Sequence, residues 1–242
     1  MNALLLSASR EGNTEYLQHT LPFISQFLSL TTETKAHIDI VFVPFAGVTI
    51  NYDEYTKKVS DALANLPVNI RGLHRFDDPQ QAISAADVIM VGGGNTFELL
   101  NQLYQQDLLQ LIQDKVTSGC KYIGWSAGSN IAGKSIRTTN DMPIVQPQSF
   151  DALNIVPFQL NPHYTEYKAP AHNGETREMR INEFMTLNPS DIVVGIEEGS
   201  ALQLSGNSLT LLGSKPAYIF RNGNKTVVND NVDLSELLAN KV

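Results

Sequence analysis

The sequence of 242 residues contains a single cysteine, Cys120. One cysteine excludes an intramolecular disulfide and a cysteine-based metal cluster. Cys120 lies just before an apolar run, a position in which a cysteine usually serves as a small buried side chain. We therefore expect it to pack in the core and not to act as a nucleophile.

Long hydrophobic runs and a surplus of basic residues are also missing. No stretch is long enough to span a bilayer, and residues 1–7 lack the basic segment and the long apolar run of a signal peptide. We expect a cytoplasmic protein without a membrane partner. The 17 Lys and Arg residues against 25 Asp and Glu residues give a net charge of −8, which argues against nucleic acid as a partner. A small ligand in a locally basic pocket is compatible with this charge.

Up to residue 125 the sequence alternates short apolar runs with helical patterns. Apolar runs at 3–6, 38–43, 68–73, 88–91 and 121–123 predict strands. Apolar residues at helical spacing predict helices over 13–30, 52–66 and 96–117, and Asp78-Pro79 opens a shorter one. Pro22 predicts a kink or a break in the first helix, and the polar segment 31–36 predicts a loop. This order is typical of a parallel sheet with helices on both faces, so we expect a single α/β domain over 1–242.

The remaining chain has a different pattern. A polar segment at 137–143 precedes an apolar stretch at 158–162, a loop at 166–174, an amphipathic helix at 175–187 and a strand at 192–196. Short strands at 202–204, 209–212 and 217–221, with Gly and Asn turns between them, predict a small C-terminal β meander. Residues 234–238 predict a last short helix.

The most informative motif is Gly124-Trp125-Ser126-Ala127-Gly128, which follows the apolar run at 121–123. A serine between a strand and a helix, flanked by small residues, is what a nucleophile elbow requires. The sharp turn lifts the hydroxyl out of the sheet edge, and the following helix directs backbone N–H groups to the same place. The alternative interpretation is a tight strand–helix turn with an inert serine.

A second motif, Gly92-Gly93-Gly94-Asn95-Thr96, lies between another predicted strand and helix. Three glycines let the backbone approach a ligand closely. We expect one N–H of this loop and the N–H of Ala127, which follows the serine, to form an oxyanion hole. A phosphate-binding loop is the competing interpretation, but the P-loop lysine and the Gly-x-Gly-x-x-Gly spacing are absent.

A serine nucleophile needs a base and a group that orients this base. His163 is the best candidate of five histidines because it follows Asn161-Pro162 at the end of an apolar run, where ligand sites of open α/β sheets gather. A buried structural histidine is the alternative. We expect His19 at the surface of a helix and His37 in a structural role, and neither His74 nor His172 has a motif around it.

Several carboxylates are candidates for the orienting group. Glu198 ends an apolar strand and precedes a glycine, whereas the adjacent Glu197 should point the other way because side chains alternate along a strand. Glu166 lies three residues after His163, and Asp141 lies in the polar segment. The pattern favours Glu198 without deciding among them, and each acid has the alternative of being a solvated surface carboxylate.

Taken together, these motifs resemble the peptidase E family of α-aspartyl dipeptidases. The resemblance rests on residues 43–49, 92–97, 124–130, 137–143, 161–163 and 174–178. It covers nearly the whole chain in order, it is highly specific, and no motif position departs from the family pattern. It is least distinct in the first predicted helix, near Thr31 and in the C-terminal tail.

The resemblance implies an α/β/α sandwich related to the class I glutamine amidotransferases, with no metal or cofactor. It also implies a serine peptidase with Ser126 as nucleophile and His163 as base. The family pattern has an essential acid at the positions of both Glu198 and Asp141, and the Ser/Cys, His, Glu order of the amidotransferases favours Glu198. If Asp141 is not the triad acid, we expect it to bind the substrate amine.

The implied substrates are dipeptides, and some tripeptides, that begin with aspartate. We expect the N–H groups of Gly94 and Ala127 to hold the oxyanion. An acidic substrate side chain calls for a cation, for which Arg177 is the first choice and Arg137 the second, although a surface ion pair would explain Arg137 equally well. A small peptide is the only partner we expect, and the protein is either a monomer or a homodimer.

Two other functions are compatible with these motifs. The related cyanophycinase-like peptidases also carry a serine elbow and act on aspartyl-containing polymers. A non-catalytic ligand-binding homologue on the same scaffold would keep the fold without an activated serine, although a candidate for every triad role argues against it.

Overall fold

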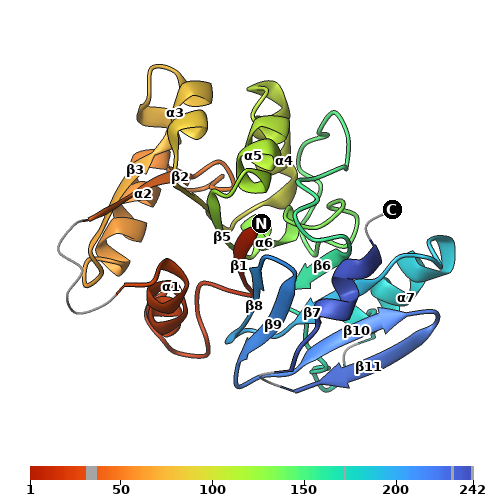
Figure 1. Ribbon diagram of the computed structural model, residues 1–242. Coiled ribbons are helices and arrows are strands. Elements are labelled where there is room, and N and C mark those ends of the chain that lie inside the picture. Colours follow the sequence, from red (N-terminus) through yellow and green to blue (C-terminus); the bar gives the residue numbers. More distant parts are fainter. Residues whose placement is uncertain (31–36, 172, 230–231, 241–242) are drawn as a thin grey trace.

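The computed structural model describes residues 1–30, 37–171, 173–229 and 232–240. The predicted loop at 31–36 and His172 lie outside these residues. The largest element is a seven-stranded sheet in the order β3-β2-β4-β5-β1-β8-β9 (Figure 1). Its strands are β1 (Asn2–Leu6), β2 (Ile38–Val43), β3 (Val68–Gly72), β4 (Val88–Val91), β5 (Lys121–Trp125), β8 (Ser200–Ser205) and β9 (Ser208–Gly213).

The strands β3, β2, β4, β5 and β1 are parallel to one another. The strand β8 is antiparallel to β1, and β9 is antiparallel to β8. Side chains along the parallel strands alternate between two cores. In β1, Leu4 and Leu6 belong to one core, and Ala3 and Leu5 belong to the other. The predicted, largely parallel sheet is therefore confirmed, and each of its two faces is buried.

Helices cover both faces of the sheet, as Figure 1 shows. Helices α1 (Leu21–Leu28) and α2 (Tyr52–Ala62) pack on one face, and α3 (Pro79–Ala85), α4 (Thr96–Gln105) and α5 (Leu109–Thr117) pack on the other. Asp78 caps α3 as predicted, because its side chain accepts a 2.9 Å hydrogen bond from the Gln81 N–H. The α/β/α sandwich is thus confirmed.

Two predicted helices are interrupted, and the helix predicted over 52–66 ends earlier, at Ala62. Instead of one helix over 13–30, a 3-10 turn, η1 (Gln18–Thr20), precedes α1, and Leu17 has a left-handed φ of 58°. Pro22 lies in the first turn of α1, where proline is tolerated, so it starts the helix and does not kink it. The helix predicted over 96–117 is interrupted at Asp107, which has a φ of 54°. Leu108 is buried at this break, so the helical spacing of the apolar residues continues across it.

A second sheet of four strands has the order β11-β10-β7-β6. Its strands are β6 (Gln159–Pro162), β7 (Val193–Ile196), β10 (Ala217–Arg221) and β11 (Asn224–Val228), and β6 and β7 are parallel. The C-terminal strands are therefore divided between two sheets and do not stand alone as a meander. The remaining elements are η2 (Leu73–Arg75), α6 (Ala127–Asn130), α7 (Arg177–Leu187) and η3 (Ser235–Asn240).

Candidate active site

Ser126 occupies a sharp turn between β5 and α6. Its φ of 53° and ψ of −116° lie outside the common regions for a non-glycine residue, a conformation that costs about 1–3 kcal/mol and persists only where the surroundings enforce it. Close packing enforces it here, because a Cβ on Gly128 would lie 2.2 Å from the Val91 carbonyl oxygen. A Cβ on Gly124 would lie 2.4 Å from the Gly128 carbonyl oxygen, so both glycines of the motif are a packing requirement of the turn.

His163 reaches this serine from the other sheet. It follows β6 directly, has a φ of 56°, and places its Nε2 2.8 Å from the Ser126 Oγ. Its Nδ1 lies 2.7 Å from the Glu198 Oε1. The structure thus brings hydroxyl, imidazole and carboxylate into one hydrogen-bonded row.

Glu198 follows β7, the strand that pairs with β6, which precedes His163. Pro162 and Ile196 are register partners at the carboxyl ends of the parallel strands β6 and β7, so the residues that follow these strands leave from one edge. Glu197 points the other way, as expected from alternation, and its Oε1 accepts a 2.6 Å hydrogen bond from the Tyr218 hydroxyl.

Asp141, the other candidate for the triad acid, lies beside the row and not within it. Its Oδ2 accepts hydrogen bonds from the Thr96 N–H, at 2.7 Å, and from the Thr96 hydroxyl, at 2.6 Å. It therefore binds the first turn of α4, where the helix dipole favours an anion. Within the described residues, the ring of His163 bonds Ser126 and Glu198 and not Asp141.

The glycine loop packs directly against Ser126. A Cβ on Gly93 would lie 2.9 Å from the Ser126 Cβ, and one on Gly94, which has a φ of +142°, would lie 2.1 Å from the Ala46 carbonyl oxygen. The Tyr55 hydroxyl donates a 2.7 Å hydrogen bond to the Gly93 carbonyl and fixes the loop from α2. Across the ranges that the structure describes, the Gly94 and Ala127 N–H groups have no backbone acceptor, so both are available to a ligand.

Two depressions meet at the serine. The larger, here called the cleft, has a volume of about 620 Å³ and is lined by Ser126, His163, Gly93, Gly94, Trp125, Tyr16, Tyr55, Lys58, Val48, Ile50 and Ile144, among others. The smaller, here called the hollow, has a volume of about 20 Å³ and is lined by Thr96, Ser126, Ala127, Asn130, Thr139, Asn140, Asp141, Pro162 and His163. The site therefore has space on two sides of Ser126.

The two candidate arginines differ in position. Arg177 begins α7 and is half-buried, and its burial lowers the pKa of its guanidinium, as does repulsion by Arg180, while the charge of Asp141 acts in the opposite direction. It is thus close enough to Asp141 for the two charges to interact. Arg137 is exposed. Neither arginine is among the residues that line the cleft or the hollow.

The segment between His163 and Arg177 is anchored at both ends by one lysine. Lys225 of β11 lies 2.9 Å from Glu166 and 2.6 Å from Glu178, which is in the first turn of α7. The Tyr164 hydroxyl also bonds Glu166. Glu166, one of the four acids considered as orienting groups, therefore holds this segment and does not contact the imidazole.

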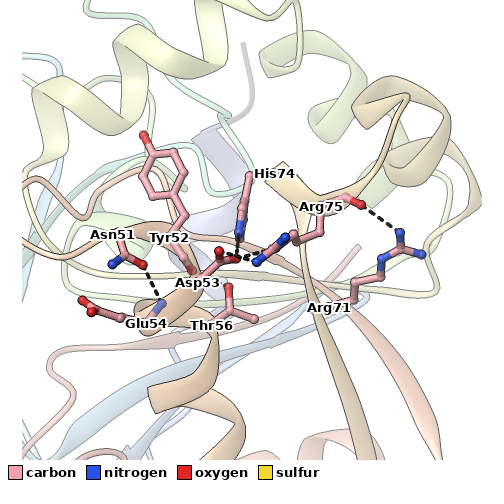
Figure 2. A network of polar contacts seen from close by, with 8 residues as sticks. All are labelled: Asn51, Tyr52, Asp53, Glu54, Thr56, Arg71, His74 and Arg75. Atoms are coloured by element: carbon pink, nitrogen blue, oxygen red, sulfur yellow. Dashed lines mark hydrogen bonds and ion pairs between the residues drawn. The ribbon is translucent and has the colours of Figure 1, made fainter.

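Of the other described histidines, His74 has a structural role. His74 Nε2 lies 2.7 Å from Asp53 Oδ1, and Arg75 pairs with the same carboxylate, so α2 is tied to the end of β3 (Figure 2). His19, expected at the surface, is half-buried, and burial lowers the pKa of its imidazole. His37 is exposed just before β2.

Sequence reasoning missed several residues around the serine. Tyr16, Tyr55 and Lys58 lie far from the motifs in sequence, and Asn130 and Ser7 look like ordinary polar residues of a turn and a strand end. Cys120 is buried and free, as expected. The described residues include no group of three His, Cys, Asp or Glu side chains placed to hold a metal ion, and none of their helices combines the length and hydropathy of a bilayer span.

Comparison with known proteins agrees with this arrangement. The sequence model described as peptidase family S51 matches residues 3–212. The chain belongs to peptidase family S51. Peptidase E of Shewanella amazonensis is 57% identical over 239 residues, which cover 98% of this chain and 99% of the relative. Peptidase E of Shewanella baltica is 55% identical, with 98% of each chain covered.

A solved structure supports the fold independently. The crystal structure of a peptidase from an acI-B1 Actinobacterium has a TM-score of 0.70, covers 96% of both chains and is 17% identical in sequence. The family model and the relatives confirm the resemblance to the family. As a member of family S51, the protein is a serine-type peptidase.

Proposed function

We propose that this S51 peptidase hydrolyses dipeptides with an N-terminal aspartate through an acyl-enzyme on Ser126. The names of its relatives and the resemblance of its motifs support this activity. The single observation that carries the mechanism is the row from Ser126 Oγ through the His163 ring to Glu198, with distances of 2.8 and 2.7 Å. These distances suit proton transfer between nucleophile and base.

In this mechanism Ser126 Oγ attacks the carbonyl carbon of the aspartyl residue while His163 Nε2 accepts the hydroxyl proton. The imidazolium then donates this proton to the leaving amine, and the peptide C–N bond breaks. Glu198 holds the imidazole tautomer and stabilises the imidazolium. A water molecule, deprotonated by His163, hydrolyses the acyl-enzyme and releases free aspartate.

The tetrahedral intermediate carries a negative oxygen that needs donors. We assign this role to the N–H of Gly94, in the glycine loop, and the N–H of Ala127, the residue after Ser126. Neither has a backbone acceptor within the described residues. Each such donor contributes about 3 kcal/mol to transition-state stabilisation. The positive φ of Gly94 and its close approach to Ala46 explain why a side chain is not tolerated in this part of the loop.

The hollow is suited to the free amine of the substrate. Asp141 offers a carboxylate there, and the Oδ1 atom of Asn130 is buried without a partner in the described residues. An ammonium group would satisfy both oxygens. We expect Arg177, whose charge interacts with that of Asp141, to pair with the acidic side chain of the substrate.

The test uses Asp-Leu and purified protein. Ser126→Ala should abolish hydrolysis while the melting temperature stays within a few degrees of wild type, and a serine-directed phosphonate should label wild type at Ser126. Retained turnover in Ser126→Ala would refute the nucleophile assignment. Cleavage of a β-linked Asp-Arg polymer but not of Asp-Leu would favour the cyanophycinase-like alternative.

A further inference from the structure

One lysine lines the cleft that contains the nucleophile. Lys58 lies on α2, three residues after Tyr55, so both side chains project from the same face of the helix. Tyr55 bonds the carbonyl of Gly93 in the glycine loop at 2.7 Å. The helix that carries Lys58 is thereby fixed directly to the loop beside Ser126.

The Lys58 ammonium lies over an aromatic ring. Its Nζ lies 4.2 Å from the centre of the Tyr16 ring, a cation–π contact. The Tyr16 ring in turn meets the ring of Trp125 edge-on, with 6.4 Å between centroids, and Trp125 immediately precedes the nucleophile. Two ring contacts therefore connect this cation with the catalytic turn.

Lys58 has no carboxylate partner in the part of the chain that the structure describes. The lysine ion pairs there are Lys57 with Asp61, Lys134 with Asp191, and Lys225 with Glu166 and Glu178. The protein has a net charge of −8, and among its described Lys and Arg residues it is Lys58 that lines the cleft. Its ammonium can accept an anionic ligand without first breaking an ion pair.

The shape of the site indicates which anion this is. With the substrate amine in the hollow beside Asp141, the leaving residue must extend into the cleft on the other side of Ser126. Val48, Ile50 and Ile144 give the cleft apolar walls, which suit an apolar side chain. In a dipeptide the leaving residue ends in an α-carboxylate, and the cation on this side is Lys58.

We propose that Lys58 binds the α-carboxylate of the leaving residue and thereby makes the enzyme select dipeptides over longer peptides and amides. This inference rests on the proposed function, because it assumes cleavage of the first peptide bond by Ser126. A longer peptide would place a neutral amide against the ammonium, and the charge-assisted hydrogen bond would be lost. Lys58 is thus a specificity residue and takes no part in the bond-breaking step.

The experiment compares Asp-Leu with Asp-Leu-amide, which lacks only the negative charge. Wild type should prefer the acid by roughly ten- to a hundredfold in kcat/KM, the range of a charge-assisted hydrogen bond. Lys58→Met should remove this preference by lowering kcat/KM for the acid and leaving that for the amide within about twofold. Lys58→Arg should restore most of the preference, since it keeps the charge.

Lys57→Met is the matched control, because Lys57 is the adjacent, exposed lysine that pairs with Asp61 at 2.6 Å and does not line the cleft. It should preserve the preference for the acid. Equal losses on acid and amide in Lys58→Met would show a structural role and overturn the inference. An unchanged preference in Lys58→Met, or a wild type that cleaves acid and amide equally well, would also overturn it.

A failure of the Lys58 inference can be distinguished from a failure of the proposed function. If wild type does not cleave Asp-Leu, the comparison is made with the dipeptide that it cleaves fastest and the amide of that dipeptide, so it does not depend on aspartate at the first position. The proposed function fails through activity of Ser126→Ala or through failure to cleave Asp-Leu. The Lys58 inference fails only through the ratio between acid and amide.

Discussion

The backbone N–H of His163 donates a 2.9 Å hydrogen bond to the Ser7 Oγ, although 155 residues separate the two positions in the chain. Ser7 is fully buried and follows β1 of the central sheet, and its hydroxyl donates in turn to the Ile196 carbonyl at 2.8 Å. One hydroxyl therefore joins the end of the central sheet to the two strands that carry His163 and Glu198. The imidazole is held at Ser126 by a contact between sheets.

The Ser7→Ala variant should therefore lose activity through the position of His163. The His163 N–H would lose its acceptor, at a cost of about 1–3 kcal/mol in the free energy of unfolding. The Ile196 carbonyl would keep its 3.1 Å hydrogen bond from the Tyr164 N–H. We expect kcat to fall with little change in KM. Denaturant unfolding and steady-state kinetics on Asp-Leu measure the two effects.

Ser135→Ala is the matched control for this prediction. It removes a buried serine hydroxyl that bonds Gln159 at the opposite end of β6. It should reduce stability by a similar amount and leave kcat near that of wild type. If both variants lower kcat equally, the effect of Ser7 is general loss of stability and not positioning.

Glu198 and Asp141 should have separable kinetic roles. Glu198→Gln disturbs the imidazole tautomer and should lower kcat by about 10²–10⁴-fold, as in other triads. Asp141→Asn should mainly raise KM for Asp p-nitroanilide, because it weakens binding of the free amine. The reverse pattern, in which Asp141→Asn abolishes kcat and Glu198→Gln acts on KM, would contradict the assignment of the two acids.

N-acetylation provides the control for Asp141. If Asp141 binds the free amine, wild type should discriminate strongly against N-acetyl-Asp p-nitroanilide, and Asp141→Asn should lose much of this discrimination. Because Asp141 also caps α4 through Thr96, the melting temperature of each variant must be compared. A loss of stability without any change in discrimination would restrict Asp141 to a structural role.

Lys225 should control the order of the segment between His163 and Arg177. Lys225→Met removes its contacts with Glu166 and Glu178; the loss of stability should be about 1 kcal/mol or less, because the two carboxylates are partly solvated. We expect faster proteolysis between residues 166 and 178 and a several-fold lower kcat/KM for Asp-Leu. Lys215→Met, which changes an exposed lysine after β9, should show neither effect.

The first half of the fold could be predicted from sequence because its signals are local. The apolar runs at 38–43 and 88–91 correspond to β2 and β4 residue by residue. The break at Asp107 could not be predicted, because Leu103, Leu108 and Ile112 all remain buried and keep the helical spacing. The apolar pattern reports which side chains are buried, and it does not report where the backbone changes direction.

The division of the C-terminal strands between two sheets also could not be predicted from the sequence. The strands β8 and β10 have similar apolar patterns, yet one pairs with β1 and the other with β7. At the site, the positions of Ser126, His163 and Glu198 followed from motifs at strand ends. Ser7, Tyr16 and Lys58 reach the site only through tertiary contacts, and no spacing along the chain indicates them.

Cys120 provides a test of which nucleophile the enzyme uses. Burial raises the pKa of its thiol to about 11, so at pH 8 the thiolate makes up about one part in a thousand. Iodoacetamide should therefore leave native activity intact, whereas the same treatment in denaturant should modify the residue rapidly. Mass spectrometry and an activity assay measure both. Rapid inactivation of the native enzyme by iodoacetamide, absent in Cys120→Ser, would contradict this prediction.

The Asp53 network should contribute stability that depends on pH. Hydrogen bonds from His74 and Arg75 lower the pKa of the Asp53 carboxyl below its ordinary value of 3.8. A lowered pKa in the folded state means that the contribution is fully present above the unfolded pKa and is lost as the pH falls through the folded pKa. Asp53→Asn should therefore be less stable than wild type at pH 7, and the gap should narrow once the pH drops below about 4.

Urea unfolding at pH 7 and at pH 3 measures the difference in the free energy of unfolding between wild type and Asp53→Asn. Asp61→Asn is the control, because it removes an ordinary exposed ion pair on the same helix. The ring of Tyr52 lies 5.5 Å from that of His74, so the network also positions the start of α2. Because α2 carries Tyr55 and Lys58 into the cleft, we expect Asp53→Asn to weaken the preference for Asp-Leu over its amide slightly. A gap in stability that is equal at both pH values would contradict the role given to this carboxylate.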